Sequence, residues 1–197
     1  MLGTLILTSR GLSDVFVRDL VRTRVDFPAR VSVAMITTAA QEKEKSPYAR
    51  SDRRRLDEMG FSRIDFFDVE KEVASGLRRY DIIYVSGGNT FYLLHHLRRS
   101  GADAVLKDML ENRPVLYIGV SAGSIVVGKS IASSADENLV GLQDLTGLQL
   151  LEEVIIPHFG DHKKAIYERM IARGYRAVCL RDGQALIVEH GGQIIIG

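Results

Sequence analysis

The segment VLYIGVSAG, residues 115–123, is the most informative part of this 197-residue chain. Its first part, Val115–Ile118, is a short apolar run of the kind typical of a strand covered on both faces. The second part is a G-x-S-x-G pattern with a helix-compatible stretch behind it. Small residues at 119 and 123 allow a tight strand-to-helix turn that holds the Ser121 hydroxyl outward. This context is that of a nucleophile elbow, although an ordinary glycine-rich turn gives the same pattern.

Strand-like runs and helix-period stretches alternate on both sides of this segment. In the first 118 residues the expected strands are Leu5–Leu7, Val31–Ile36, Ile64–Phe67, Ile82–Val85 and Val115–Ile118. The expected helices are Ser13–Arg22 with Ser13 as N-cap, Tyr48–Met59, Phe91–Arg99 and Gly101–Glu111. Such alternation predicts an α/β fold, a three-layer α/β/α sandwich around a mostly parallel, doubly wound sheet.

The pattern changes after residue 124. Residues 131–147 are polar and predict an excursion from the sheet. Beyond them the sequence predicts one helix, Lys163–Ala172. It also predicts four strands: Val154–Ile156, Ala177–Leu180, Ala185–Glu189 and Gln193–Ile196. The last two strands are joined by His190-Gly191-Gly192, a hairpin signal. With no repeat or linker, residues 1–197 are expected to form a single domain.

The charge balance and the cysteine content indicate which partners and which cellular compartment to expect. The chain has 26 Lys and Arg against 25 Asp and Glu, a formal net charge of +1. We therefore expect neither nucleic acid nor an anionic membrane as a partner. No apolar run approaches the length needed to span a bilayer. One cysteine and no signal-like leader predict a cytoplasmic protein. The sequence is compatible with a homodimer but does not require one.

A second glycine-containing turn, Ser86–Thr90, also follows a predicted strand and precedes a predicted helix. Two glycines leave backbone N–H groups accessible, so the loop could form an oxyanion site or a phosphate cradle; a plain tight turn is the simpler interpretation. Asn89 or Thr90 can cap the next helix. Because ligands bind at the carboxyl ends of strands in open α/β sheets, we expect this loop and the elbow to lie together.

A nucleophilic serine needs a base, and His158 is the best candidate. It follows the strand Val154–Ile156, which puts it at the expected ligand-bearing edge. His95 and His96 lie in a leucine-striped helix, where surface positions are expected. The spacing of His158 and His162 suggests a metal site, but Pro157 and Gly160 argue against one continuous helix there. We expect no metal and no other cofactor.

The third member of a triad would be a carboxylate that orients the imidazole. Asp136 lies in the loop after the elbow, and Asp182 lies just after a predicted strand. The residues alone do not separate these two candidates.

Three motifs together resemble one known family. They are Tyr84–Leu94, Tyr117–Ser124 and Ile156–Phe159. In order and context they are similar to the peptidase E and cyanophycinase family of serine peptidases. That family has a class I glutamine amidotransferase-like, flavodoxin-like fold with serine at the elbow. The resemblance covers most of the chain and implies a single peptidase E-like domain.

The resemblance implies a serine hydrolase of small peptides, with Ser121 as nucleophile and His158 as base. Its acid matches either Asp136 or Asp182, of which we favour Asp182 because a strand-end carboxylate is better fixed. The oxyanion donors would be the amides of Gly88 and Ala122, with Asn89 in the same substrate-binding loop.

One departure leaves the substrate open. Family members that prefer an N-terminal aspartate carry an arginine on the helix after the histidine, and that position falls near Tyr167 here. Lys163, Lys164 or Arg169 are the available substitutes, although lysine lacks the guanidinium fork. The alternatives are the same triad acting on a non-peptide ester or amide, and a non-catalytic module that binds a small metabolite.

Overall fold

The computed structural model describes residues 1–197 and has a central seven-stranded sheet of order β3-β2-β4-β5-β1-β8-β9. Five neighbouring strands are parallel, and the β8–β9 hairpin continues the sheet in antiparallel fashion. The strands of this sheet are β1 (Thr4–Thr8), β2 (Ser32–Ile36), β3 (Arg63–Phe67), β4 (Ile82–Val85), β5 (Leu116–Val120), β8 (Ala185–Glu189) and β9 (Gly192–Ile196). The predicted fold class, a mostly parallel α/β sandwich, is confirmed.

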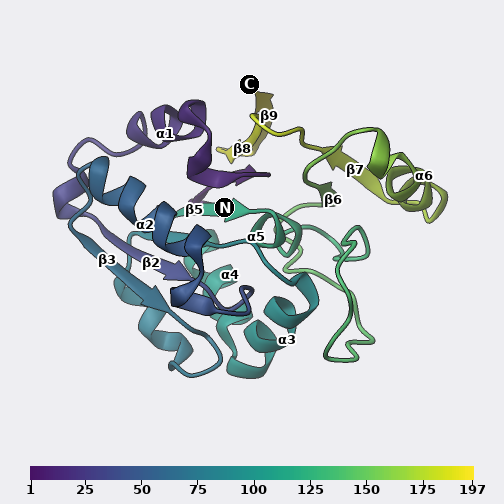
Figure 1. Ribbon diagram of the computed structural model, residues 1–197, viewed down its shortest axis with the longest axis horizontal. Helices are drawn as coiled ribbons and strands as arrows, with labels where there is room; N and C mark the ends of the chain where they lie inside the picture. Colours follow the sequence, from purple (N-terminus) through teal and green to yellow (C-terminus); the bar gives the residue numbers. More distant parts are fainter.

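Helices cover both faces of this sheet. Figure 1 shows α1 and α2 on one side and α3 and α4 on the other. Their bounds are Val15–Arg22 for α1, Pro47–Glu58 for α2, Thr90–Ser100 for α3 and Ala102–Asn112 for α4. None of the helices has the combination of length and apolar character that crossing a membrane requires.

Alternation along each strand produces two separate cores. In β1, Leu5 and Leu7 join the cluster that contains the apolar residues of α3 and α4, whereas Ile6 joins the cluster of α1 and α2. All three side chains are fully buried. Successive side chains of a strand point to opposite faces, so a run without polar residues is required when both faces are covered. The near-continuous apolar runs of the sequence therefore match the burial of the strands.

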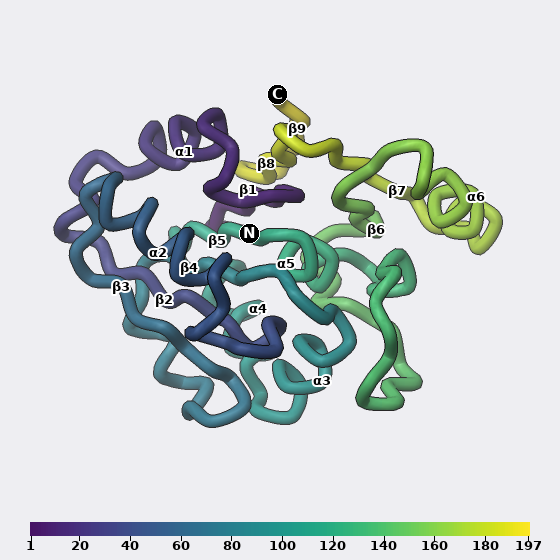
Figure 2. The backbone as a smooth tube through the Cα atoms, in the orientation of Figure 1, coloured from purple at the N-terminus to yellow at the C-terminus, as the bar shows by residue number.

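A smaller sheet stands beside the main one. It consists of β6 (Glu153–Ile156) and β7 (Arg176–Cys179), which pair in parallel and are connected through α6 (Lys164–Ala172). Met170 of α6 packs on Val154 and Ile156 to form a third apolar cluster. Figure 2 shows this unit at one side of the molecule and the preceding green segment running down beside α3. That segment contains residues 131–147, which form no helix or named strand, as predicted.

The predicted start of the first helix is wrong. Residues Gly11–Ser13 form a 3₁₀ turn, and α1 begins at Val15 with Asp14 as N-cap. Gly11 has a φ of 58°, which turns the chain out of β1 before the helix can begin. The Asp14 carboxylate caps no helical amide; it accepts a hydrogen bond from Gly183 N at 3.1 Å instead. The carboxylate of the N-cap residue thus contacts a distant loop instead of the helix that follows it.

Candidate active site

A cavity of about 750 Å³ lies at the carboxyl ends of the parallel strands. Segments that follow β1, β2, β4 and β5 all contribute to it, as expected for an open α/β sheet. Its walls are formed by Ser9, Arg10, Ser13, Ala40, Gln41, Glu42, Ser46, Pro47, Tyr48, Ala49, Asp52, Ser86, Gly87, Gly88, Val120, Ser121, His158 and Asp182. The predicted nucleophile, base and one of the two predicted acids therefore face the same space.

Ser121 occupies a strained turn between β5 and α5 (Ala122–Ile125). Its φ of 49° is unusual for a residue with a side chain, and its amide is fixed by a 2.9 Å bond to Thr8 O. No side chain fits at either glycine of the motif. A Cβ on Gly119 would lie 2.7 Å from the Gly123 carbonyl oxygen, and a Cβ on Gly123 would overlap the carbonyl of Val85. The tight elbow therefore requires glycine at both ends of the G-x-S-x-G pattern.

The glycine loop after β4 lies directly against this elbow. A Cβ built on Gly87 would be 3.3 Å from Ser121 Cβ. Gly88 has a φ of 143° and packs so closely on the carbonyl of Ala39 that no side chain fits. The amides of Gly88 and Ala122 donate to no acceptor within the protein. Both N–H groups therefore lack a hydrogen-bond partner within the protein.

The side chain of Asn89, predicted to take part in substrate binding, is used within the protein. Its Oδ1 accepts from Tyr92 N at 2.9 Å and caps α3, while its Nδ2 donates to Glu137 O at 2.8 Å. Asn89 is not among the residues that line the cavity. It holds the glycine loop between α3 and the segment that follows the elbow.

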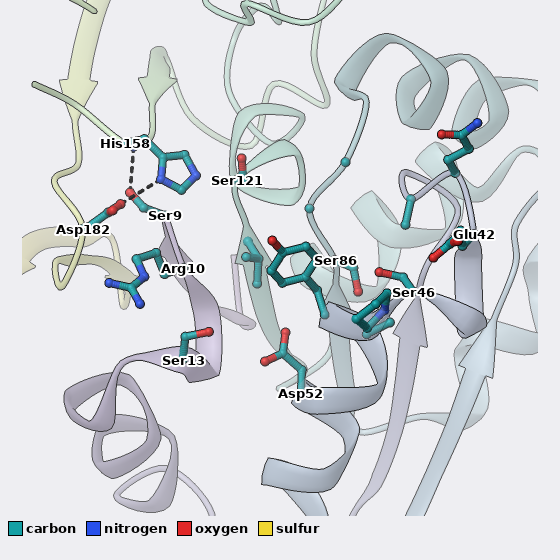
Figure 3. Close-up of a pocket in the computed structure, with 18 residues that line it drawn as sticks. Ser9, Arg10, Ser13, Glu42, Ser46, Asp52, Ser86, Ser121, His158 and Asp182 are labelled. Atoms are coloured by element: carbon teal, nitrogen blue, oxygen red, sulfur yellow. Dashed lines mark hydrogen bonds and ion pairs between the residues drawn. The ribbon is translucent and has the colours of Figure 1, made fainter. Parts of the chain in front are cut away.

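The small sheet supplies a histidine and a carboxylate. His158 Nδ1 lies 2.8 Å from Asp182 Oδ1, and the ring is turned toward Ser121 (Figure 3). Ser9, which is only 2% exposed, accepts from His158 N at 2.9 Å and donates to Leu180 O at 3.1 Å. Ser121 and His158 are not hydrogen-bonded to each other. A base and its nucleophile are often separated in this way until substrate is bound.

The other candidate acid, Asp136, lies elsewhere. Its Oδ2 accepts from Thr90 N at 2.8 Å and from Thr90 Oγ1 at 2.6 Å, with a third bond from Ser134 Oγ at 2.9 Å. This places the carboxylate at the N-terminus of α3, where a negative charge is favourable. Asp136 makes no hydrogen bond to His158, so Asp182 is the one of the two candidate acids that contacts the histidine.

Ser9, Arg10 and Asp52 are among the cavity residues that reasoning from the sequence missed. Ser9 and Arg10 follow β1 directly, and their position at a strand end was the available signal. Asp52 lies on α2, where nothing distinguished it from its charged neighbours. Its carboxylate accepts from Tyr84 Oη at 2.6 Å and from Arg55 at 2.8 Å. Burial raises the pKa of Asp52 despite these two hydrogen bonds.

None of the candidates for an aspartate-binding cation lines the cavity. Lys163 donates to Pro157 O at 2.7 Å, and burial lowers the pKa of its ammonium group. Lys164 pairs with an aspartate on its own turn, and Arg169 is exposed on α6. Tyr167 packs edge-on against a neighbouring phenylalanine ring.

The remaining histidines lie outside the cavity. His162 is exposed in the turn before α6. His96 was expected at the surface but is only 5% exposed, because its ring packs against Tyr92 with centroids 4.3 Å apart. Burial lowers the pKa of His96. No three His, Cys, Asp or Glu side chains are grouped as metal ligands would be.

Comparison with known proteins gives a consistent assignment. A family model described as peptidase family S51 matches residues 5–196. An uncharacterized peptidase of Listeria monocytogenes is 30% identical over 156 residues, which cover 73% of this chain and 75% of that protein. A protein named probable alpha-aspartyl dipeptidase from Drosophila melanogaster is 26% identical over 84% of this chain and 72% of its own length.

A solved structure agrees with these sequence relatives. The crystal structure of a Listeria monocytogenes protein assigned as peptidase E matches with a TM-score of 0.81 and 26% identity, over 98% of both chains. The resemblance drawn from the three motifs is therefore confirmed at the level of the family.

Proposed function

The chain belongs to peptidase family S51, and on this premise we propose that it hydrolyses short peptides through Ser121, His158 and Asp182. The observation that carries the proposal is the strained Ser121 turn facing the same cavity as the 2.8 Å His158–Asp182 pair. A carboxylate at Nδ1 favours the tautomer with its proton on that nitrogen. The other ring nitrogen is then free to accept the serine proton.

In the proposed reaction, Ser121 Oγ attacks the scissile carbonyl while His158 takes its proton. The amides of Gly88 and Ala122 stabilise the resulting oxyanion, and one such donor contributes about 3 kcal/mol to transition-state stabilisation. His158 then protonates the leaving amine, which departs and leaves an acyl ester on Ser121. Water repeats the sequence, with His158 as base again, and the acid product is released.

The substrate class is inferred from the size and lining of the site. A cavity of about 750 Å³ suits a short peptide, and no wall carries the cations expected near Tyr167. We therefore propose small peptides as substrates without a requirement for an N-terminal aspartate.

A fluorophosphonate probe tests the nucleophile directly. The wild-type protein should be labelled once, at Ser121, and Ser121→Ala should lose all labelling. Ser13→Ala is the matched control, since Ser13 lines the same cavity with similar partial exposure, and it should keep the label. Wild-type protein that is folded yet unlabelled would favour the metabolite-binding alternative.

A library of dipeptides, with and without an N-terminal aspartate, then identifies the substrate. Labelling of Ser121 without hydrolysis of any peptide would instead favour a non-peptide ester or amide as substrate.

A further inference from the structure

The cavity walls carry more acidic than basic side chains. Arg10 is the only lysine or arginine among the lining residues, whereas Glu42, Asp52 and Asp182 are the acids. Asp52 is already bound by Tyr84 and Arg55, and Asp182 is bound by His158. The cavity therefore has one permanent cation that is available to a ligand.

Arg10 is held loosely and beside the catalytic pair. Its side chain is 50% exposed, and its one ion-pair partner, Asp14, is 3.8 Å away, beyond hydrogen-bonding distance. Asp14 accepts from Gly183 N, the residue after Asp182. Figure 3 shows Arg10 on the same side of the cavity as His158 and Asp182. The guanidinium group thus retains its donors and lies near the proton-transfer side of the site.

The reaction determines which part of a peptide lies on that side. His158 must protonate the nitrogen of the leaving amino acid, so this amino acid is bound next to the histidine. In a dipeptide the terminal carboxylate carbon is two bonds from that nitrogen, about 2.5 Å away. A bound dipeptide therefore brings its carboxylate to the side of the cavity that carries Arg10. The planar guanidinium fork is the side-chain group best matched to a carboxylate.

We propose that Arg10 binds the terminal carboxylate of the leaving amino acid and thereby directs the enzyme to dipeptides. This inference rests on the proposed peptidase function and names the substrate end that the site recognises. It differs from aspartate recognition, because the charge that is bound belongs to the peptide backbone and is present in every dipeptide.

The competing explanation is that Arg10 acts on Asp182 and only supports the triad. The two roles differ in how they depend on the substrate. A residue that binds the carboxylate affects only substrates that carry one and acts chiefly on KM, whereas a residue that acts through the triad changes kcat for all substrates.

The test uses X-Ala dipeptides and the same peptides with a C-terminal amide. Arg10→Gln should lower kcat/KM for the dipeptides by about 10- to 100-fold, mainly through KM, the range expected for a hydrogen-bonded ion pair. It should leave the amides within about twofold of the wild type. The Arg10→Lys protein should have a kcat/KM for the dipeptides between those of Arg10→Gln and the wild type. Arg22→Gln is the matched control, since Arg22 is also 50% exposed but lies away from the cavity, and it should change neither series.

Equal losses of kcat/KM on dipeptides and amides, or no loss on either, would overturn the assignment of Arg10. Calorimetry on the Ser121→Ala protein makes the result independent of turnover. There X-Ala dipeptides should bind at least about tenfold tighter than their amides, and adding Arg10→Gln should remove the difference. Equal binding, or no binding of either series, overturns the inference. Absence of wild-type hydrolysis alongside this preference would count against the peptidase proposal alone.

Discussion

Replacing Asp182 by asparagine should slow hydrolysis strongly while leaving the protein folded. Asp182 is half exposed, and its Oδ1 lies 2.8 Å from His158 Nδ1. Asparagine has nearly the same shape, but it carries no charge and can present an N–H to the ring. The imidazole would then favour the wrong tautomer and lose its partner in the charged state.

The size of the effect follows from the exposure of this pair. The same exchange in a buried serine-protease triad costs about 10⁴ in kcat. Here Asp182 and His158 are 50% and 36% exposed at their side chains, so water can partly replace the lost interaction. We therefore expect kcat to fall by about 10²–10³, or roughly 3–4 kcal/mol in activation free energy.

The matched comparison is Asp136→Asn, the same chemical change at the other candidate acid. Asp136 binds the N-terminus of α3, so its exchange should cost about 1 kcal/mol of unfolding free energy and leave kcat within about fivefold. Steady-state kinetics on a cleaved dipeptide and urea denaturation measure the two quantities. If Asp136→Asn slows kcat more than Asp182→Asn does, the assignment of the triad acid is wrong.

Three further outcomes test the local geometry. Gly88→Ala should destabilise the protein by at least about 2 kcal/mol in thermal denaturation and abolish fluorophosphonate labelling, because its Cβ would overlap the Ala39 carbonyl; wild-type behaviour would contradict this packing. Ser121→Gly should exceed Ser121→Ala in unfolding free energy by about 1 kcal/mol, since the φ of 49° favours glycine; the reverse order by urea denaturation would refute strain. Burial raises the pKa of Asp68, but hydrogen bonds, chiefly from Lys43, outweigh it and leave that pKa below its ordinary value. The resulting stability is present above about pH 5 and lost toward pH 2, so the stability advantage of wild type over Lys43→Met should shrink across this range; an unchanged difference would exclude the linkage.

The elements of the main sheet could be predicted because local pattern and burial coincide there. Ile82–Val85 and Ala185–Glu189 are strands over the predicted residues. A β-branched run bounded by turn residues has few alternatives when both faces are covered. Ser121 and the Ser86–Thr90 loop could also be singled out from the sequence, because each directly follows a clearly predicted strand.

The residues alone did not identify the partner of His158, although Asp182 was favoured over Asp136, because this contact depends on how distant loops pack. Asp136 and Asp182 are both acidic residues in loops, and only the pairing of β6 with β7 brings one of them to the histidine. The same reason explains why Ser9 was missed, since its bond to His158 N spans 149 residues of chain. His96 was assigned to the surface because leucines defined the helix stripe, whereas the Tyr92 ring extends the buried face.

Ser121 follows a strand of the seven-stranded sheet, whereas His158 and Asp182 follow strands of the two-stranded sheet. Under the proposed mechanism, activity therefore depends on how the two sheets are docked as well as on whether each is folded. On warming, a slight displacement of the smaller sheet would abolish turnover while the circular dichroism signal of the larger sheet persisted. Activity and circular dichroism recorded against temperature would then have different midpoints. The difference between the two midpoints would measure how strongly the two sheets are held together.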